Sequence, residues 1–307
     1  MRSMPSLKNT RKQKPASSKI PRPKQSPRKP LVMLSLLLLT GILSSCEATY
    51  PAKTLTTQLT KLVKEERKID VTCRITGKTL WVYLPLQNLV DEKKLTWSSA
   101  GLEEMSKVLS IVHRVILSTD AKLNFLCVIA ADVKKYGVEL MIIEYLPDIK
   151  EAILEKFSRG EFFSRSIKDV GLNAGAVNDL TGESKKFYDI TFDQFVALQI
   201  IHRTKNLFAE DKTLDELFDI RSTSWSEKFG IIRIEFEFMK KKYNLPPQEE
   251  KIKPLDYAKM TAALVVKNYD FKNFQLIELT DTFSKESVKL SPQDFKKVKI
   301  NLPRFED

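Results

Sequence analysis

The sequence has few of the residues that build small cross-linked or metal-rich domains. It holds three cysteines, two histidines and nine glycines in 307 residues. Three cysteines are too few for a disulfide-rich mini-protein or a cysteine-rich zinc site, and nine glycines exclude a collagen-like repeat. The composition is 42% hydrophobic and 29% charged, which is enough apolar material to bury a core. The length suggests two domains or one large one.

Acidic residues are missing altogether from the first thirty positions. Ten basic residues and six of the fourteen prolines fall there, so this arm buries too little apolar surface to fold and is predicted to be disordered. The whole chain has a formal net charge of +12, which taken alone suggests a nucleic acid or an anionic membrane as partner. Because the arm holds ten of these charges, the prediction depends on whether the arm stays attached.

A long apolar run is missing too, but a short one follows the basic arm. Residues 31–43 read LVMLSLLLLTGIL, without a charge. A helix that spans a bilayer needs about 20 such residues, whereas the apolar region of a secretory signal needs about 7–15. The basic arm, the short run and the small residues after it indicate an export signal. The alternative, an uncleaved membrane-anchoring helix, is disfavoured by this length and by the charge of Glu47.

The four residues at the end of this region, Leu43-Ser44-Ser45-Cys46, resemble the lipobox of bacterial lipoprotein signal peptides. The resemblance covers residues 1–47 only, and no family is recognised for the folded body. It implies that Cys46 receives a diacylglyceryl thioether, that the signal is cleaved between Ser45 and Cys46, and that the new amino terminus is acylated. The cysteine thiol is the nucleophile that accepts the lipid. Several acyl chains exceed the roughly two signals that stable anchoring requires.

The predicted location is the bacterial cell envelope, with the mature chain lipid-anchored and facing the periplasm or the exterior. Lipoproteins of this kind commonly carry Asp after the cysteine as an inner-membrane retention signal, so Glu47 favours the outer membrane. Without residues 1–45 the chain keeps 41 basic and 39 acidic residues, net +2. That is an ordinary soluble surface and not a phosphate-binding one. We therefore expect membrane attachment through Cys46 and no nucleic-acid partner.

The mature chain is predicted to be an α+β protein, with antiparallel sheet hairpins alternating with helices in two small domains. Four of the nine glycines lie within residues 160–182, which favours a linker there. A ligand loop also concentrates glycine, but no phosphate-loop spacing occurs in this stretch. The predicted parts are a signal peptide (1–45), a lipidated tether with a short amphipathic helix (46–68), a first α+β domain (69–160), a connector (161–190) and a second α+β domain (191–307).

The hydrophobic periodicity predicts the elements of each domain. The tether is predicted to contain a helix over 54–68. In the second domain, residues 255–269 fit a helix that runs into a strand, and the pattern does not decide between helix and strand. In the first domain we expect a hairpin of 69–76 and 79–86, a helix over 100–117, buried strands at 123–131 and 138–146, and a helix from Pro147. In the second we expect helices over 193–208 and 213–218, strands at 232–238 and 274–282, and a short helix from Ser291.

Cys73 and Cys127 both fall inside predicted strands. Outside the cytoplasm they form a disulfide if those strands are neighbours, because the two Cα atoms must lie within about 7 Å of each other. The alternative is that both are small buried side chains without a covalent partner.

Residues suited to catalysis or metal binding are sparse. His113 and His202 lie in predicted helices with no other ligand residue three or four positions away, so no metal pair is expected. Glu235 and Glu237 share a strand face about 7 Å apart, near the spacing of paired glycosidase carboxylates. Arg233 shares that face, however, and alternating charge is typical of a solvated sheet surface.

These observations favour a lipid-anchored cell-envelope protein that acts as a non-catalytic binding or assembly component. An envelope protein or a glycan is the expected partner, and no cofactor or metal is expected. Strand edges such as 232–238 are expected to accept a partner's strand. The alternative is a lipid-anchored envelope hydrolase acting on a cell-wall or glycan substrate, with carboxylates assembled from distant positions.

Overall fold

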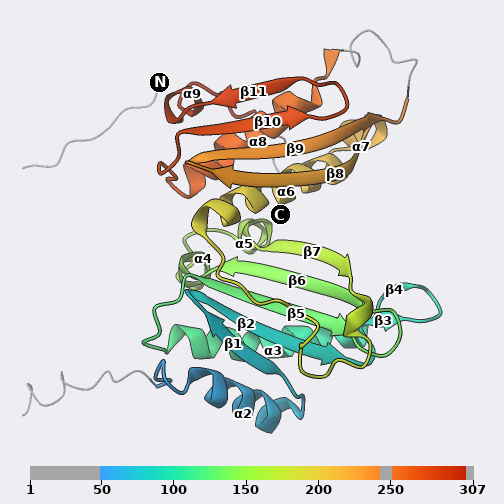
Figure 1. The fold of residues 1–307 in the computed structure, drawn as a ribbon, viewed down its shortest axis with the longest axis vertical. Helices are drawn as coiled ribbons and strands as arrows, with labels where there is room; N and C mark the ends of the chain where they lie inside the picture. Colours follow the sequence, from blue (N-terminus) through green and yellow to red (C-terminus); the bar gives the residue numbers. More distant parts are fainter. Residues whose placement is uncertain (1–48, 243–250, 302–307) are drawn as a thin grey trace, which may run out of the picture. The chain divides into compact units, whose positions relative to one another are not determined.

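The structure is a computed structural model and describes residues 49–242 and 251–301. The predicted lipidation and cleavage residues, Ser45 and Cys46, lie outside the described residues. The described part belongs to one compact unit and confirms the α+β prediction, because two mixed sheets with hairpins pack against helices (Figure 1). Within it, no helix is both long enough and apolar enough to cross a bilayer. The boundaries of the two domains stay a prediction.

The first sheet has five strands in the order β1-β2-β5-β6-β7. The two predicted hairpins are present as β1–β2 and β5–β6, while β2 pairs with β5 in parallel. This pairing is parallel because helix α3 (Ser99–Leu117) returns the chain along the sheet between the two strands. The bounds are β1 (Thr72–Thr76), β2 (Thr79–Leu86), β5 (Phe125–Asp132), β6 (Val138–Tyr145) and β7 (Ile167–Leu172), with a small separate hairpin of β3 (Val90–Asp91) and β4 (Thr96–Trp97).

One face of this sheet is covered by α3 and by α2 (Leu55–Arg67), the predicted tether helix. Leu55, Leu59 and Val63 recur every four residues, which places them on one side of α2, and all three are fully buried. Alternate residues of β2 pack into the same core. Helix α3 begins after Ser98, whose side chain accepts a hydrogen bond from the Gly101 backbone N–H at 3.3 Å.

The opposite face of the first sheet is covered by the predicted connector and not by helices alone. This segment, residues 161–190, includes most of α5 (Arg159–Arg165), then β7, which is the edge strand of the sheet, and a 3-10 turn η1 (Ala174–Ala176). The residues after η1 cross the face of the sheet (Figure 1). The indole of Trp81 donates to the Tyr188 carbonyl at 2.8 Å, and the phenol of Tyr83 donates to the Asp179 carbonyl at 3.0 Å. Both aromatic side chains are therefore core residues held by the crossing segment.

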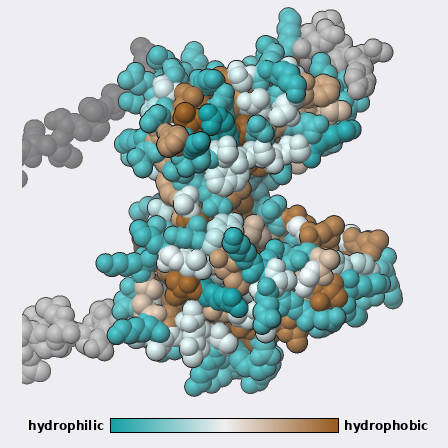
Figure 2. Space-filling model, viewed as in Figure 1, coloured by the Kyte–Doolittle hydropathy of each residue, from teal (hydrophilic) through white to brown (hydrophobic). Residues whose placement is uncertain are grey.

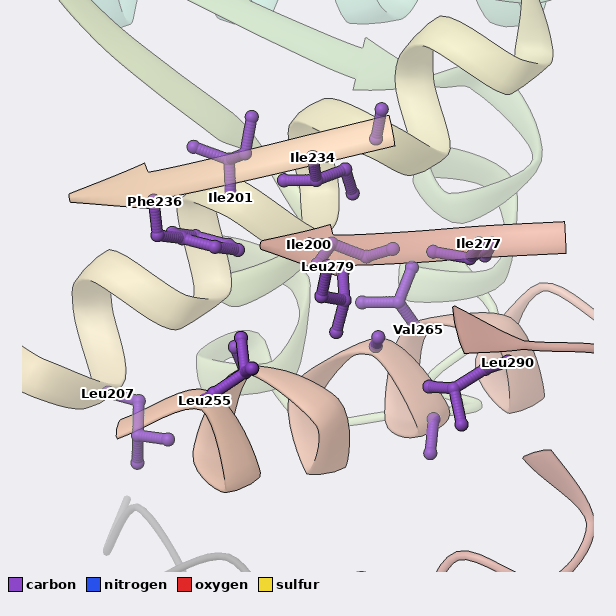
Figure 3. Close-up of a cluster of buried hydrophobic side chains, with 14 of the residues drawn as sticks. Ile200, Ile201, Leu207, Ile234, Phe236, Leu255, Val265, Ile277, Leu279 and Leu290 are labelled. Atoms are coloured by element: carbon purple, nitrogen blue, oxygen red, sulfur yellow. The ribbon is translucent and has the colours of Figure 1, made fainter. Parts of the chain in front are cut away.

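The second sheet has the order β11-β10-β9-β8. Its strands are β8 (Phe218–Lys228), β9 (Ile231–Lys240), β10 (Leu276–Asp281) and β11 (Ser287–Leu290). Figure 3 shows Ile234 and Phe236 of β9 and Leu279 of β10 facing α8 across a shared core. The helices of this part are α6 (Phe192–Glu210), α7 (Lys212–Leu217), α8 (Pro254–Asn268) and α9 (Pro292–Phe295), and α4 (Leu146–Ile153) follows the first sheet.

The prediction that strand 232–238 offers an edge to a partner is wrong. This segment lies within β9, which pairs antiparallel with β8 on one side and parallel with β10 on the other. Both of its rows of backbone hydrogen-bonding groups are therefore used inside the sheet. Among the described residues, β8 and β11 are the edges of the second sheet, and the register of β8 is interrupted between Ile220 and Thr223.

Candidate functional site

The two cysteines lie on opposite faces of the first sheet and are free thiols. Cys73 of β1 is opposite Val82, whereas Cys127 of β5 is opposite Trp81. Val82 and Trp81 are consecutive residues of β2, so they point to different faces, and β2 itself separates the other two strands. The condition set for a disulfide is not met. Both thiols are free, and the burial expected in the alternative holds for Cys127, whereas Cys73 is half-buried by exposed area. Burial raises the pKa of Cys73 to about 11.

The two histidines lie in different helices, His113 in α3 and His202 in α6. His113 of α3 lies 2.6 Å from the buried carboxylate of Glu144, which also accepts from the Ser166 hydroxyl at 3.3 Å. In a Ser-His-Asp triad the histidine stands between serine and carboxylate, but here the carboxylate stands in the middle. His202 is buried in α6, and burial, followed by the charges of Lys168 and Arg203, lowers its pKa to about 4.

Glu235 and Glu237 lie on the solvated face of the second sheet, as the charge pattern predicts. Their carboxylates accept from the hydroxyls of Ser224 at 2.7 Å and Ser222 at 2.9 Å on the neighbouring strand β8. The apolar residues that alternate with them are buried beneath. These contacts are cross-strand pairs that stabilise a sheet surface, and the two glutamates are not enclosed by other elements.

A group of buried and half-buried polar side chains joins α4, α5, α6 and the residue after α8. The Arg165 guanidinium contacts Asp148 at 3.0 Å and Glu161 at 2.7 Å. Arg203 contacts the same Glu161 oxygen at 3.1 Å, and the Tyr269 phenol donates to Asp148 at 2.8 Å. Two cations thus neutralise two anions, which is the condition for burying such charges at tolerable cost.

The pKa shifts in this cluster follow from burial and pairing. Burial raises the pKa of Asp148 above its usual range, although Tyr269 and Arg165 pull it down. For Glu161 burial acts in the same direction, but the charges of Arg203 and Arg165 outweigh it and lower the pKa. Burial and the nearby Asp148 charge raise the pKa of Tyr269. Since each group faces a partner, the cluster resembles a structural junction more than an open reaction site.

An open apolar groove lies on the second sheet's helical side, between α8 and α9. Its volume is about 780 Å³, within the range typical of small-molecule sites. The floor is part of the hydrophobic core, whereas the walls are half-buried and reach the surface. The apolar lining consists of Ala263, Val266, Phe271, Phe295, Val298 and Ile300, together with Pro292.

Charged side chains at this groove are mostly cationic. Lys267 on α8, Lys272 after α8 and Lys296 after α9 line it and are exposed. One anion, Asp270, is also present and pairs with Lys272 at 2.7 Å. Within the described part of the chain, Lys267 and Lys296 form no ion pair. The groove therefore combines an apolar interior with a net positive rim.

Sequence reasoning did not find this groove. Ala263, Val266 and Lys267 follow the spacing of one helix face, but the sequence did not decide whether this segment is a helix or a strand. The other wall comes from a single short turn of helix and the residues after it. No residue-level motif links the two segments, which lie about 30 residues apart in the chain.

Another apolar surface lies at the free edge of the first sheet. On β7, Val170 is 57% exposed and Leu172 is 83% exposed, and Figure 2 shows hydrophobic surface at the end of this strand. A smaller cavity of about 340 Å³ is lined mainly by polar residues, including Lys253, Asp256 and Glu286. Neither place combines the volume of the groove with its apolar lining and cationic rim.

Metal binding finds no support in the described ranges. Within residues 49–242 and 251–301, no three His, Cys, Asp or Glu side chains are grouped so as to hold an ion. No protein-family model matches the chain, and no curated protein or solved structure matches it significantly.

Proposed function

We propose that this chain is a lipid-anchored cell-envelope protein that acts as a non-catalytic binding component, attached through an acylated Cys46. The observation that carries the binding role is the groove between α8 and α9, with its apolar interior and net positive rim. Apolar walls with a few charged groups recognise a ligand by burial and charge. The lining holds one carboxylate and no histidine, cysteine or serine, so it offers recognition groups and few reactive ones.

The start of the folded body supports the anchored arrangement. The Tyr50 backbone N–H donates to the Ser118 carbonyl at 3.2 Å, and the Ala52 N–H donates to the Asp120 carboxylate at 2.6 Å. Tyr50 is four positions after Cys46, which bounds the reach of the tether to about 14 Å. A body attached this closely works at the bilayer surface.

The hydrolase alternative lacks a comparable observation. The carboxylate pair that suggested it, Glu235 and Glu237, lies on an open sheet face and is bonded to serines. The buried carboxylate of Asp148 and the half-buried one of Glu161 are each paired with arginine. The groove therefore supports the binding role better than these carboxylates support hydrolysis.

Two substitutions in the full chain test the proposal. Cys46→Ser should abolish labelling by a radioactive fatty acid and leave an uncut precursor; a variant that is still labelled would exclude this anchor. For the binding role, a benzoylphenylalanine in place of Val298 should yield a light-dependent adduct of defined mass in the native envelope. The same probe in place of Lys299, which does not line the groove, is the control. No adduct at Val298 would contradict a binding function for the groove.

A further inference from the structure

The groove between α8 and α9 offers an apolar surface on which a hydrocarbon chain can be buried. Its floor consists of side chains that belong to the core, with Ala263, Phe271 and Phe295 each less than 10% exposed. Val266, Val298 and Ile300 form half-buried walls above that floor. Burying apolar area against such walls is favourable by about 25 cal/mol per Å², so an apolar ligand gains more here than at a flat surface.

The lysines at the rim favour a ligand whose polar end is negatively charged. Lys267 stands on the α8 wall and Lys296 on the α9 wall, so cations approach from both sides. In the described part of the chain neither lysine is neutralised by a carboxylate, whereas Lys272 is paired with Asp270. A lysine ammonium binds an anion as a compact point charge, and a charge-assisted hydrogen bond is stronger than a neutral one.

From these features we infer that the groove binds a free long-chain carboxylate, with the hydrocarbon chain along the apolar walls and the carboxylate between Lys267 and Lys296. This inference rests on the proposed function, because a body held at a bilayer meets such amphiphiles. The volume of about 780 Å³ suits a single-chain amphiphile within the usual range of ligand sites. A two-chain phospholipid is bulkier, so the free carboxylate is the occupant to which we commit.

The test uses the full chain in its native envelope and a palmitic-acid analogue that carries a diazirine and a terminal alkyne. Light-independent label on the Cys46 peptide reports lipidation, and light-dependent label reports the bound ligand. We expect light-dependent adducts on peptides that contain Val266 or Val298. Label confined to Cys46 would overturn the groove ligand but leave the anchor standing, whereas groove adducts without Cys46 label would overturn the anchor alone.

Two charge-reversal variants separate specific binding from partition. Lys267→Glu with Lys296→Glu should reduce the groove adduct roughly tenfold, since two exposed charge contacts contribute about 0.5–1 kcal/mol each. The control variant, Lys259→Glu with Lys299→Glu, reverses the same number of lysine charges on the same two segments. Neither position lines the groove, so this variant should leave the adduct unchanged. Equal labelling of the two variants would overturn the assignment.

The nature of the polar end is tested with two further probes. A diazirine fatty alcohol of the same length lacks the charge and should label the groove several-fold less. A diazirine phosphatidylglycerol in vesicles presents the anion on a two-chain lipid and should not label it. Equal labelling by the alcohol would overturn recognition of the carboxylate, and labelling by the phospholipid alone would overturn the free carboxylate as occupant.

Discussion

The phenol of Tyr269 donates a hydrogen bond to the carboxylate of Asp148 at 2.8 Å, across 121 positions of sequence. Asp148 lies in α4, after the first sheet, and Tyr269 directly follows α8, which packs on the second sheet. Arg165 binds the other oxygen of the same carboxylate at 3.0 Å. This buried carboxylate with its two donors is therefore one of the contacts that join the two sheets.

Removing the phenol tests this link. Tyr269→Phe keeps the ring but leaves Asp148 with one donor fewer, so the free energy of unfolding should fall by about 1–2 kcal/mol. Asp148→Ala leaves the largely buried Arg165 without that anion and should cost about 3–5 kcal/mol. Urea unfolding followed by circular dichroism measures both values. Tyr257→Phe on α8 is the control. It should change the free energy of unfolding little, because no hydrogen bond of its hydroxyl is found among the described residues. Equal effects of the two tyrosine variants would contradict the role given to the Tyr269 hydroxyl.

The buried His202 predicts a loss of stability in mild acid. Its pKa is lowered to about 4, chiefly by burial and then by the charges of Lys168, Arg203 and Lys205, whereas an unfolded histidine titrates near 6.5. The unfolded state therefore binds the proton first. The neutral ring's contribution is complete above about pH 6.5 and is lost as pH falls towards 4, by up to about 3 kcal/mol.

His202→Asn removes this titration. The wild-type advantage over the variant should shrink as the pH is lowered from 7 to about 4.5, as measured by denaturant unfolding at several pH values. Carboxylates titrate in both proteins and cancel in the difference. A difference that stays constant with pH would show that the His202 ring is not held neutral.

Gly182, in the segment that crosses the first sheet, lies where a side chain would meet the ring of Tyr83. Its φ is +76°, and a Cβ there would lie 2.8 Å from the Cγ of the buried Tyr83 ring. Gly182→Ala should lower the free energy of unfolding by about 2–4 kcal/mol, from left-handed strain and the displaced ring. Gly171→Ala is the control, because nothing lies within 4 Å of its Cβ position, and it should be close to neutral. Comparable losses at both glycines would argue against this packing.

The free thiols predict slow alkylation and no response to reductant. Burial raises the pKa of Cys73 to about 11 and that of Cys127 well above its usual value, so few thiolates are present at neutral pH. Iodoacetamide should label both cysteines slowly in the native state, Cys127 more slowly than Cys73, and rapidly after denaturation. Mass spectrometry of the protein isolated under oxidising conditions should show no increase in mass from added hydrogens when the protein is reduced. Such an increase would reveal a disulfide.

Much of the fold followed from periodicity, because buried positions repeat at the period of each element. The hairpin predicted at Gly77 turns there with a φ of +56°, and the alternation of Ile232, Ile234 and Phe236 marks a strand with one buried face. The missed strands have weak patterns. Strand β8 carries serines and charges on a mostly exposed surface, and β7 has only its first residue buried.

The arrangement of the strands was less accessible to sequence reasoning. The alternating pattern around Phe236 predicts a half-exposed strand but not its place in the sheet. The pairing of β9 with a strand on each side shows that it is an internal strand. The same limitation applies to the candidate site. The groove needs Lys267 and Lys296 on facing walls, and no local pattern in the chain specifies that two distant segments meet.

The crossing segment has a consequence for how the molecule unfolds. Ile190 and, beyond it, Phe195 of α6 are part of the core on the first sheet, and Phe192 packs against that core and the second sheet's core alike. A fragment ending near residue 190 would expose that face to water. We expect the two sheets to lose structure together in one cooperative transition, and truncated chains that keep only one of them to aggregate.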